Sequence, residues 1–270
     1  MGSAPAPVLD ELVRQAARTS EPDRYLAALL APNAARADLI ALAAFAGEAA
    51  RISRLVNEPM MGEVRLQWWR DVLEAGATNG SAAQSPVAEA ICRTAARHQL
   101  SEEEFLGLLE AHGQELWPGF PPTGSELERY LDRSEGALLR LSAAVLGVPE
   151  GGATDDLIYA AGQAYGRVRL LLLLPGLIAK GHAVLPPGSG DWQRASARIT
   201  GDARDWLAKT RTQLANAPRA LLPALLPVAL VEPYLKVFEG LGSGVARQSA
   251  DITPLTRVWK IWLASMRGRV

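Results

Sequence analysis

Pairs of carboxylates at helical spacing are the residues with the clearest potential for chemistry, because carboxylates three or four positions apart share a helix face and can hold Mg²⁺. Asp71 and Glu74 have this spacing, and Asp155 and Asp156 are adjacent. A lone acidic pair on a helix usually forms a solvated face or pairs with arginine. Asp155 and Asp156 also follow Thr154 at a predicted helix start, where acidic side chains offset the helix dipole. We therefore expect no metal site at either pair.

Two adjacent tryptophans, Trp68 and Trp69, lie between arginines in a segment with helical periodicity. Neighbouring side chains on an α-helix point about 100° apart, so one ring can face the interior while the other packs against another helix. Packing in the core is enough to explain both rings. Alternatively, a ring forms the wall of a cavity and contacts an apolar ligand.

The composition limits the possible classes of function. The chain has 270 residues, 49% of them hydrophobic, and 28 basic against 29 acidic residues give a net charge of −1. This balance offers no electrostatic case for binding nucleic acid. The single cysteine excludes an internal disulfide, and the three histidines are too dispersed for a zinc site. The first residues lack the basic and apolar regions of a secretory signal, so we expect a cytoplasmic protein.

Helical periodicity dominates the chain and no segment alternates like a β-strand, so we predict an all-α fold. Recurrent helix-start signals, such as Ser101 followed by three glutamates, and breaks rich in glycine and proline divide the chain into roughly seven to nine helices. We expect residues 1–19 to form a partly disordered leader and residues 20–268 a single domain. The apolar stretches 170–179 and 220–231 are short and contain prolines, so neither is expected to span a bilayer.

The stretch from Glu58 to Asp71 contains Glu-Pro-Met-Met-Gly-Glu followed by Trp-Trp-Arg-Asp. Asp-Arg-Tyr-Leu at residues 23–26 precedes it, and Gly-Gln-Ala-Tyr-Gly at 162–166 and Gly-His-Ala-Val-Leu-Pro at 181–186 follow it. In this order the segments resemble the squalene/phytoene synthase family over residues 20–265. The resemblance implies a helical bundle of the isoprenoid-synthase type with a central cavity, and a lid around residues 186–188.

Enzymes of that family join two prenyl diphosphates, and two acidic motifs on facing helices hold the Mg²⁺ ions that neutralise the leaving diphosphate. The resemblance places the early motif on Ala50, Arg51 and Arg54, and the later motif on Leu173 and Leu177. No carboxylate stands at any of these positions. A shifted alignment does not restore them, because Glu48 is the only acid between residues 39 and 57, and residues 157–190 contain none.

Loss of both acidic motifs argues against ordinary Mg²⁺-dependent prenyl transfer, because removal of even one preorganised electrostatic group costs about two to three orders of magnitude in rate. The pattern resembles a branch of the family formed by bacterial relatives of a mitochondrial complex I assembly factor. We therefore expect no catalytic residues and no cofactor, and Mg²⁺ only if the chain is a prenyltransferase after all.

The candidate ligand-binding residues are the basic and aromatic side chains that the resemblance places around the cavity. They are Arg51, Arg54, Arg65, Trp68, Trp69, Arg167 and Arg169. Guanidinium groups at the mouth of the cavity would bind phosphate directly, without Mg²⁺. Alternatively, the arginines extend to solvent or pair with Glu48 and neighbouring acids.

The leading hypothesis is a non-catalytic family member that binds a lipid or isoprenoid, or that acts in assembly of a respiratory complex. Its expected partners are an isoprenoid or lipid ligand, subunits of a respiratory complex and a peripheral membrane contact, on the cytoplasmic face of the inner membrane, with no nucleic acid. The alternative is a prenyltransferase that acts on farnesyl or geranylgeranyl diphosphate. A membrane-binding protein without a specific ligand is a third possibility.

Overall fold

A computed structural model of the chain describes residues 6–76, 85–181, 192–241 and 251–270, which form helices and contain no β-strand. The predicted all-α fold is confirmed. Residues 1–5 of the expected leader and the expected lid around residues 186–188 lie outside the described residues.

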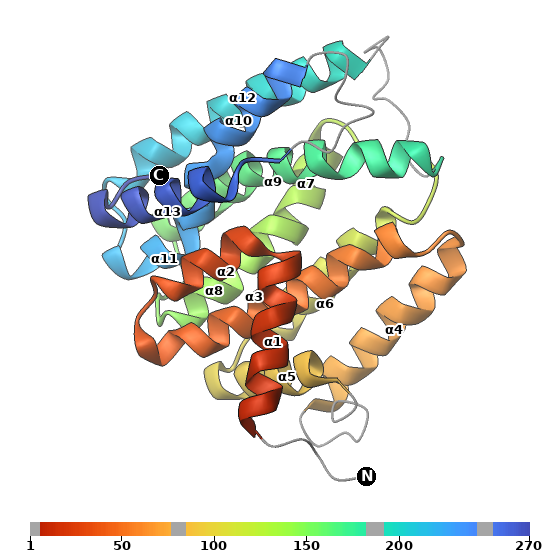
Figure 1. The fold of residues 1–270 in the computed structure, drawn as a ribbon, viewed down its shortest axis with the longest axis vertical. Coiled ribbons are helices and arrows are strands. Elements are labelled where there is room, and N and C mark those ends of the chain that lie inside the picture. The colour runs from red at the N-terminus through yellow and green to blue at the C-terminus, as the bar shows by residue number, and fades with distance from the viewer. Residues whose placement is uncertain (1–5, 77–84, 182–191, 242–250) are drawn as a thin grey trace.

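The first half of the chain is built around one long buried helix. The helices are α1 (Ala6–Ser20), α2 (Pro22–Leu29), α3 (Asn33–Leu55), α4 (Pro59–Ala75), α5 (Pro86–His98) and α6 (Glu102–Gln114). Prolines Pro22 and Pro32 separate the first three helices, because proline fits the first turn of a helix and not its interior. Most of α3 is buried, and α1, α2, α4, α5 and α6 all contact it (Figure 1).

Helix α1 occupies most of the segment in which we expected a partly disordered leader. Val13 and Ala17 are buried, and α1 contacts α3 and α5. Burial of this apolar side against the bundle stabilises the helix, whereas composition alone pointed to disorder at the chain end.

The second half is organised around α9. Its elements are α7 (Ser125–Leu131), the π-helical turn η3 (Asp132–Gly136), α8 (Ala137–Val145), α9 (Ala153–Ala179), α10 (Trp192–Leu214), the short turns η4 (Arg219–Leu221), α11 (Leu222–Leu225) and η5 (Leu226–Leu230), α12 (Val231–Leu241) and α13 (Pro254–Arg267). Helix α9 continues past Pro175 to Ala179. Figure 1 shows α10, α12 and α13 together on one side of the molecule and α4 on the other.

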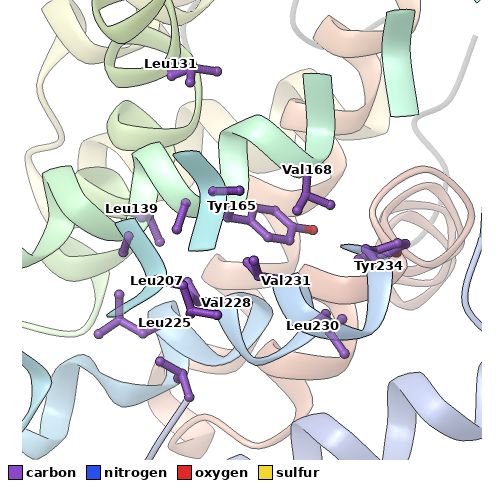
Figure 2. Packing of buried hydrophobic residues seen from close by; sticks show 14 of the residues in the cluster. Leu131, Leu139, Tyr165, Val168, Leu207, Leu225, Val228, Leu230, Val231 and Tyr234 are labelled. Carbon is purple, nitrogen blue, oxygen red and sulfur yellow. The ribbon is translucent and has the colours of Figure 1, made fainter. Parts of the chain in front are cut away.

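Two apolar clusters form the core. One gathers side chains of α3, α4, α5 and α6, and the other gathers side chains of α9, α10 and the segment from η4 to α13. Figure 2 shows the second cluster, in which Tyr165 and Val168 of α9 lie near Val231 and Tyr234 of α12. Within the described residues, the run Arg219–Leu241 is the one helical stretch long and apolar enough to cross a membrane, with a mean hydropathy of 1.6. It lies largely inside this cluster, with 61% of its most apolar window buried.

Candidate functional site

A small cavity lies between α3, α6, α7, η3 and α9. Its volume is about 60 Å³, which is room for roughly two water molecules. The wall is apolar where α9 and α7 contribute leucines and polar where α3, α6 and η3 meet. The lining residues are Ala50, Arg54, His112, Glu115, Tyr130, Leu131, Ser134, Glu135, Gly166, Arg169, Leu170, Leu172 and Leu173.

Four charged side chains alternate in sign beside the cavity. Arg24 donates to Glu21 at 2.6 Å and also to Glu135. Arg169 donates to Glu21 and lies 3.5 Å from a Glu135 oxygen. Both carboxylates are almost wholly buried, at 1% and 7% exposure. Each acid therefore lies between two guanidinium groups in a closed network.

Electrostatics stabilise the charges of Glu21 and Arg169 within this network. Burial alone would raise the pKa of Glu21, but the adjacent guanidinium groups of Arg169 and Arg24 outweigh burial and lower it. Burial likewise opposes the charge on Arg169, yet its carboxylate neighbours raise the Arg169 pKa well above its usual value. Each side chain thus stabilises the charge of the other.

A second polar cluster surrounds Glu115, which is 1% exposed. Its carboxylate contacts His112 Nδ1 at 2.7 Å and accepts hydrogen bonds from Tyr130 at 2.7 Å and Ser53 at 2.5 Å. Burial would raise the pKa of Glu115, but His112, Ser53 and Tyr130 together lower it. The same burial and the nearby carboxylate raise the pKa of Tyr130, so the phenol stays protonated. Both carboxylate oxygens of Glu115 therefore contact protein groups.

Arg54 differs from the other cavity arginines because, within the described ranges, no carboxylate lies within salt-bridge distance of it. Its Nε donates to the carbonyl of Ala50 one turn earlier, at 3.3 Å. Burial, and then the positive charge of Arg169, lower the pKa of Arg54. Arg54 is exposed to solvent as well as lining the cavity, so it places a positive charge at the mouth of the cavity.

Only two of the seven candidate residues line the cavity, namely Arg54 and Arg169. Arg51 points away and lies 3.7 Å from Glu48, with 43% of its side chain exposed. Arg167 lies on another face of α9, where it donates to Gln163 and stacks over the Trp206 ring. Positions 167 and 169 of a helix point about 200° apart, so both could not face one cavity.

The tryptophans of α4 belong to the core and do not line this cavity. Trp69 is buried, with its ring 5.0 Å from that of Phe45, and the Trp68 ring lies 4.9 Å from Trp69. These rings therefore do not form the expected cavity wall, because α4 packs them toward α3. Arg65, on the same helix, is exposed to solvent.

The polar residues that dominate the site were missed from the sequence. They are Glu21, Arg24, Ser53, His112, Glu115, Tyr130 and Glu135. Arg24 and Glu135 are 111 residues apart, and Glu21 and Arg169 are 148 apart. No local spacing signals such a contact. The one available signal was Arg24, which lies in the Asp-Arg-Tyr-Leu segment of the family resemblance.

The side chains around the cavity do not fit a divalent cation. The three buried carboxylates already accept from arginine, histidine, tyrosine or serine, and Arg54 and Arg169 bring positive charge to the same space. The resemblance placed the Mg²⁺-binding acids of the family at five positions. Of these, Ala50, Arg54 and Leu173 line the cavity, whereas Arg51 and Leu177 do not. In the part of the chain that the structure describes, no three His, Cys, Asp or Glu side chains gather in a metal-binding arrangement.

Comparison with known proteins agrees with this fold. The model of the squalene/phytoene synthase family matches residues 17–188. One similar solved structure is squalene synthase HpnC from Alicyclobacillus acidocaldarius, with a TM-score of 0.66 and 17% identity; the match covers 99% of this chain and 97% of that chain. Another is a dehydrosqualene synthase in complex with a ligand, with a TM-score of 0.74 and 12% identity; the match covers 97% of this chain and 96% of that chain. At these identities the two structures show the fold alone, an isoprenoid-synthase-like bundle.

Among curated proteins, the relatives carry the name NADH dehydrogenase (ubiquinone) complex I, assembly factor 6. The Mus musculus protein is 24% identical over 269 residues, covering 93% of this chain and 80% of the mouse protein. The Rattus norvegicus protein is 26% identical over 266 residues, covering 91% and 79%. The family model covers well over half of the chain, and the matched residues 17–188 include all of α3 and α9. This chain belongs to the squalene/phytoene synthase family.

Proposed function

We propose that this chain is a non-catalytic member of its family that serves the assembly of a respiratory complex of the complex I kind. The proposal takes its partner class from the mouse and rat relatives, which are named as complex I assembly factors. The partners would be subunits of the complex, and the place of action the cytoplasmic face of the membrane that holds it.

The observation that carries the non-catalytic part is the ion-paired network beside the cavity. Glu21, Arg24, Glu135 and Arg169 neutralise one another, so neither of these two acids is left free to hold a metal ion. The remaining volume is about 60 Å³, far below the roughly 300–1,000 Å³ of ordinary small-molecule pockets. The space has neither the ligands for Mg²⁺ nor the volume for two prenyl chains.

The expected lipid or isoprenoid ligand stays a prediction. The cavity has an apolar wall, formed by Leu170, Leu172 and Leu173, and a positive charge from Arg54. This combination matches the chemistry of an amphipathic anion. The cavity in this conformation is too small for such a ligand, so binding requires α9 to move away from η3. We therefore give the assembly role priority over a role as a lipid carrier.

A diphosphate-release assay on the purified protein separates this proposal from prenyl transfer. Farnesyl or geranylgeranyl diphosphate is supplied with Mg²⁺, and we expect no release above a protein-free background. Turnover with either substrate would establish the prenyltransferase alternative and end the non-catalytic proposal.

Deletion of the gene in its own organism tests the assembly role. We expect less fully assembled complex I on native gels, with restoration by the wild-type chain. The Arg51→Asp variant is a matched control, because Arg51 is partly exposed and pairs with Glu48 outside the cavity. It should restore assembly, whereas Arg51→Asp/Arg54→Asp, which also reverses the charge at the cavity, should restore it less fully. Unchanged complex I in the deletion strain would reject the assembly role.

A further inference from the structure

Helix α13 carries an apolar stripe on its solvent side. Five large side chains at positions i, i+3, i+4, i+7 and i+11 lie within roughly 100° of the helix circumference. They are Leu255 (83% exposed), Val258 (50%), Trp259 (58%), Trp262 (43%) and Met266 (70%). A helix normally turns such a stripe toward the core, so its exposure here indicates a surface that binds something.

The opposite face of α13 is fixed to the bundle. Ile261 and Ala264 are buried, and the buried Arg257 donates to Asp23 of α2 at 2.5 Å and to the Tyr234 hydroxyl at 3.1 Å. Asp23 also accepts from Tyr165 of α9 at 2.7 Å. These buried polar contacts come from three other helices, so α13 cannot rotate to hide its stripe without breaking them.

Positive charge gathers at the C-terminal end of the stripe. Helix α13 contains no Asp or Glu, and beside Met266 at its C-terminal end a groove of about 810 Å³ is lined by Arg211, Arg219, Arg267 and Arg269. No acidic side chain is among the residues that line this groove. All four arginines are exposed. The surface thus combines tryptophans, aliphatic side chains and clustered guanidinium groups.

We propose that this face, the α13 surface, docks on an anionic lipid bilayer. The helix would lie in the plane of the membrane, with Leu255, Val258 and Met266 below the headgroups and the two indole rings at the interface. The arginines of the groove would bind lipid phosphates. A second copy of this chain fits the surface less well, because it would bring an equally basic groove rather than an acidic one.

The most exposed apolar residues elsewhere provide a comparison. Met60, Met61 and Val64 of α4 are 54–65% exposed, but Glu58 and Glu63 lie among them. This patch offers similar apolar area without the surplus of positive charge. It therefore serves as a matched control for non-specific apolar adsorption.

Flotation of the full-length protein with vesicles tests the proposal. Vesicles of phosphatidylcholine mixed with phosphatidylglycerol should bind the wild type, more strongly at low salt, and vesicles of phosphatidylcholine alone should bind it weakly. The Trp259→Ser/Trp262→Ser variant should lose at least about tenfold in vesicle affinity. Met60→Ser/Val64→Ser should bind like the wild type. Arg219→Gln/Arg267→Gln should weaken binding and its dependence on salt.

A second variant, Leu255→Asp/Met266→Asp, repeats the test with residues that make little contact with the fold, and thermal melting checks that each variant is folded. Wild-type protein that stays with the soluble fraction, or folded variants of α13 that float as well as the wild type, would overturn the proposal. So would self-association that the tryptophan variant abolishes, because a second copy would then be the occupant. The vesicle test is independent of the complex I deletion test, so either proposal can fail alone.

Discussion

At the scale of single residues, substitution of Arg169 should disturb the candidate site most. It contacts two buried carboxylates at once, Glu21 and Glu135, and removal of one partner from a buried ion pair leaves an uncompensated charge. Arg51, by contrast, is partly exposed to solvent and lies beside Glu48. The two positions separate a buried network from an ordinary surface pair.

The Arg169→Met variant, which keeps most of the apolar stem, should lower the free energy of unfolding by about 3–5 kcal/mol. Arg51→Ala should change it by less than about 0.5 kcal/mol, because exposed pairs contribute little. Urea denaturation measures both. The double variant Glu21→Gln/Arg169→Met should be more stable than the single Arg169→Met variant, since one buried charge is removed. A cost for Arg169→Met no larger than that for Arg51→Ala would contradict the buried network.

At the scale of elements, the close approach of α9 to η3 forms the network. Gly162 faces the backbone of Gly136, where an added Cβ would lie 3.0 Å from the Gly136 N and Cα atoms. One turn later, a Cβ on Gly166 would lie 3.2 Å from the Glu135 side chain. This glycine face lets α9 come near enough for Arg169 to reach Glu135, and the π-helical turn η3 carries that glutamate.

Two alanine substitutions in α9 should therefore have opposite signs. Gly162→Ala should destabilise the protein by about 1–3 kcal/mol, because the backbone of η3 must move. Gly176→Ala should stabilise it by about 0.5–1 kcal/mol, since alanine is the better helix former and no atom lies within 4 Å of the position that the added methyl group would take. Thermal or urea unfolding of both variants measures these changes in stability. Stabilisation by Gly162→Ala would mean that α9 and η3 are not tightly packed.

At the scale of the whole molecule, buried acids tie the stability of the fold to pH. Glu21 and Glu115 have pKa values lowered below the ordinary 4.5, so the unfolded chain takes up protons more readily than the folded one. Their stabilising contribution is fully present above about pH 4.5 and is lost as the pH falls through that value toward the lowered folded pKa values. The two acids connect elements of both apolar clusters, so their protonation loosens the bundle as a unit.

The midpoint of urea unfolding, measured between about pH 6 and pH 3, should fall steeply on the acid side. In Arg169→Met the fall should be shallower, because Glu21 loses the guanidinium group that lowers its pKa most. Arg51→Ala should keep the wild-type slope. Equal slopes in all three proteins would show that Glu21 is not coupled to Arg169.

Much of the fold followed from local patterns in the sequence. The cap at Ser101, the proline at position 22 and the break at Gly76 lie at the ends of observed helices, because these signals act within a few residues of the backbone that they terminate. The missing acids at positions 50, 54 and 173 were also visible in the sequence, and these three side chains line the cavity. The family resemblance assigned these positions, together with Arg51 and Leu177, which do not line the cavity.

The tertiary structure alone decided which charged side chains gather beside the cavity. Glu21, Arg24, Glu135 and Arg169 come together across 111 to 148 residues of chain, and no periodicity records a contact of that length. It also decided that Trp69 enters the core whereas Trp259 and Trp262 face solvent, although all three belong to helices. The sequence determined which residues share a helix face, since that depends on 3.6-residue geometry. Which face is covered depends on the packing of other helices, and that is settled only when the whole chain is folded.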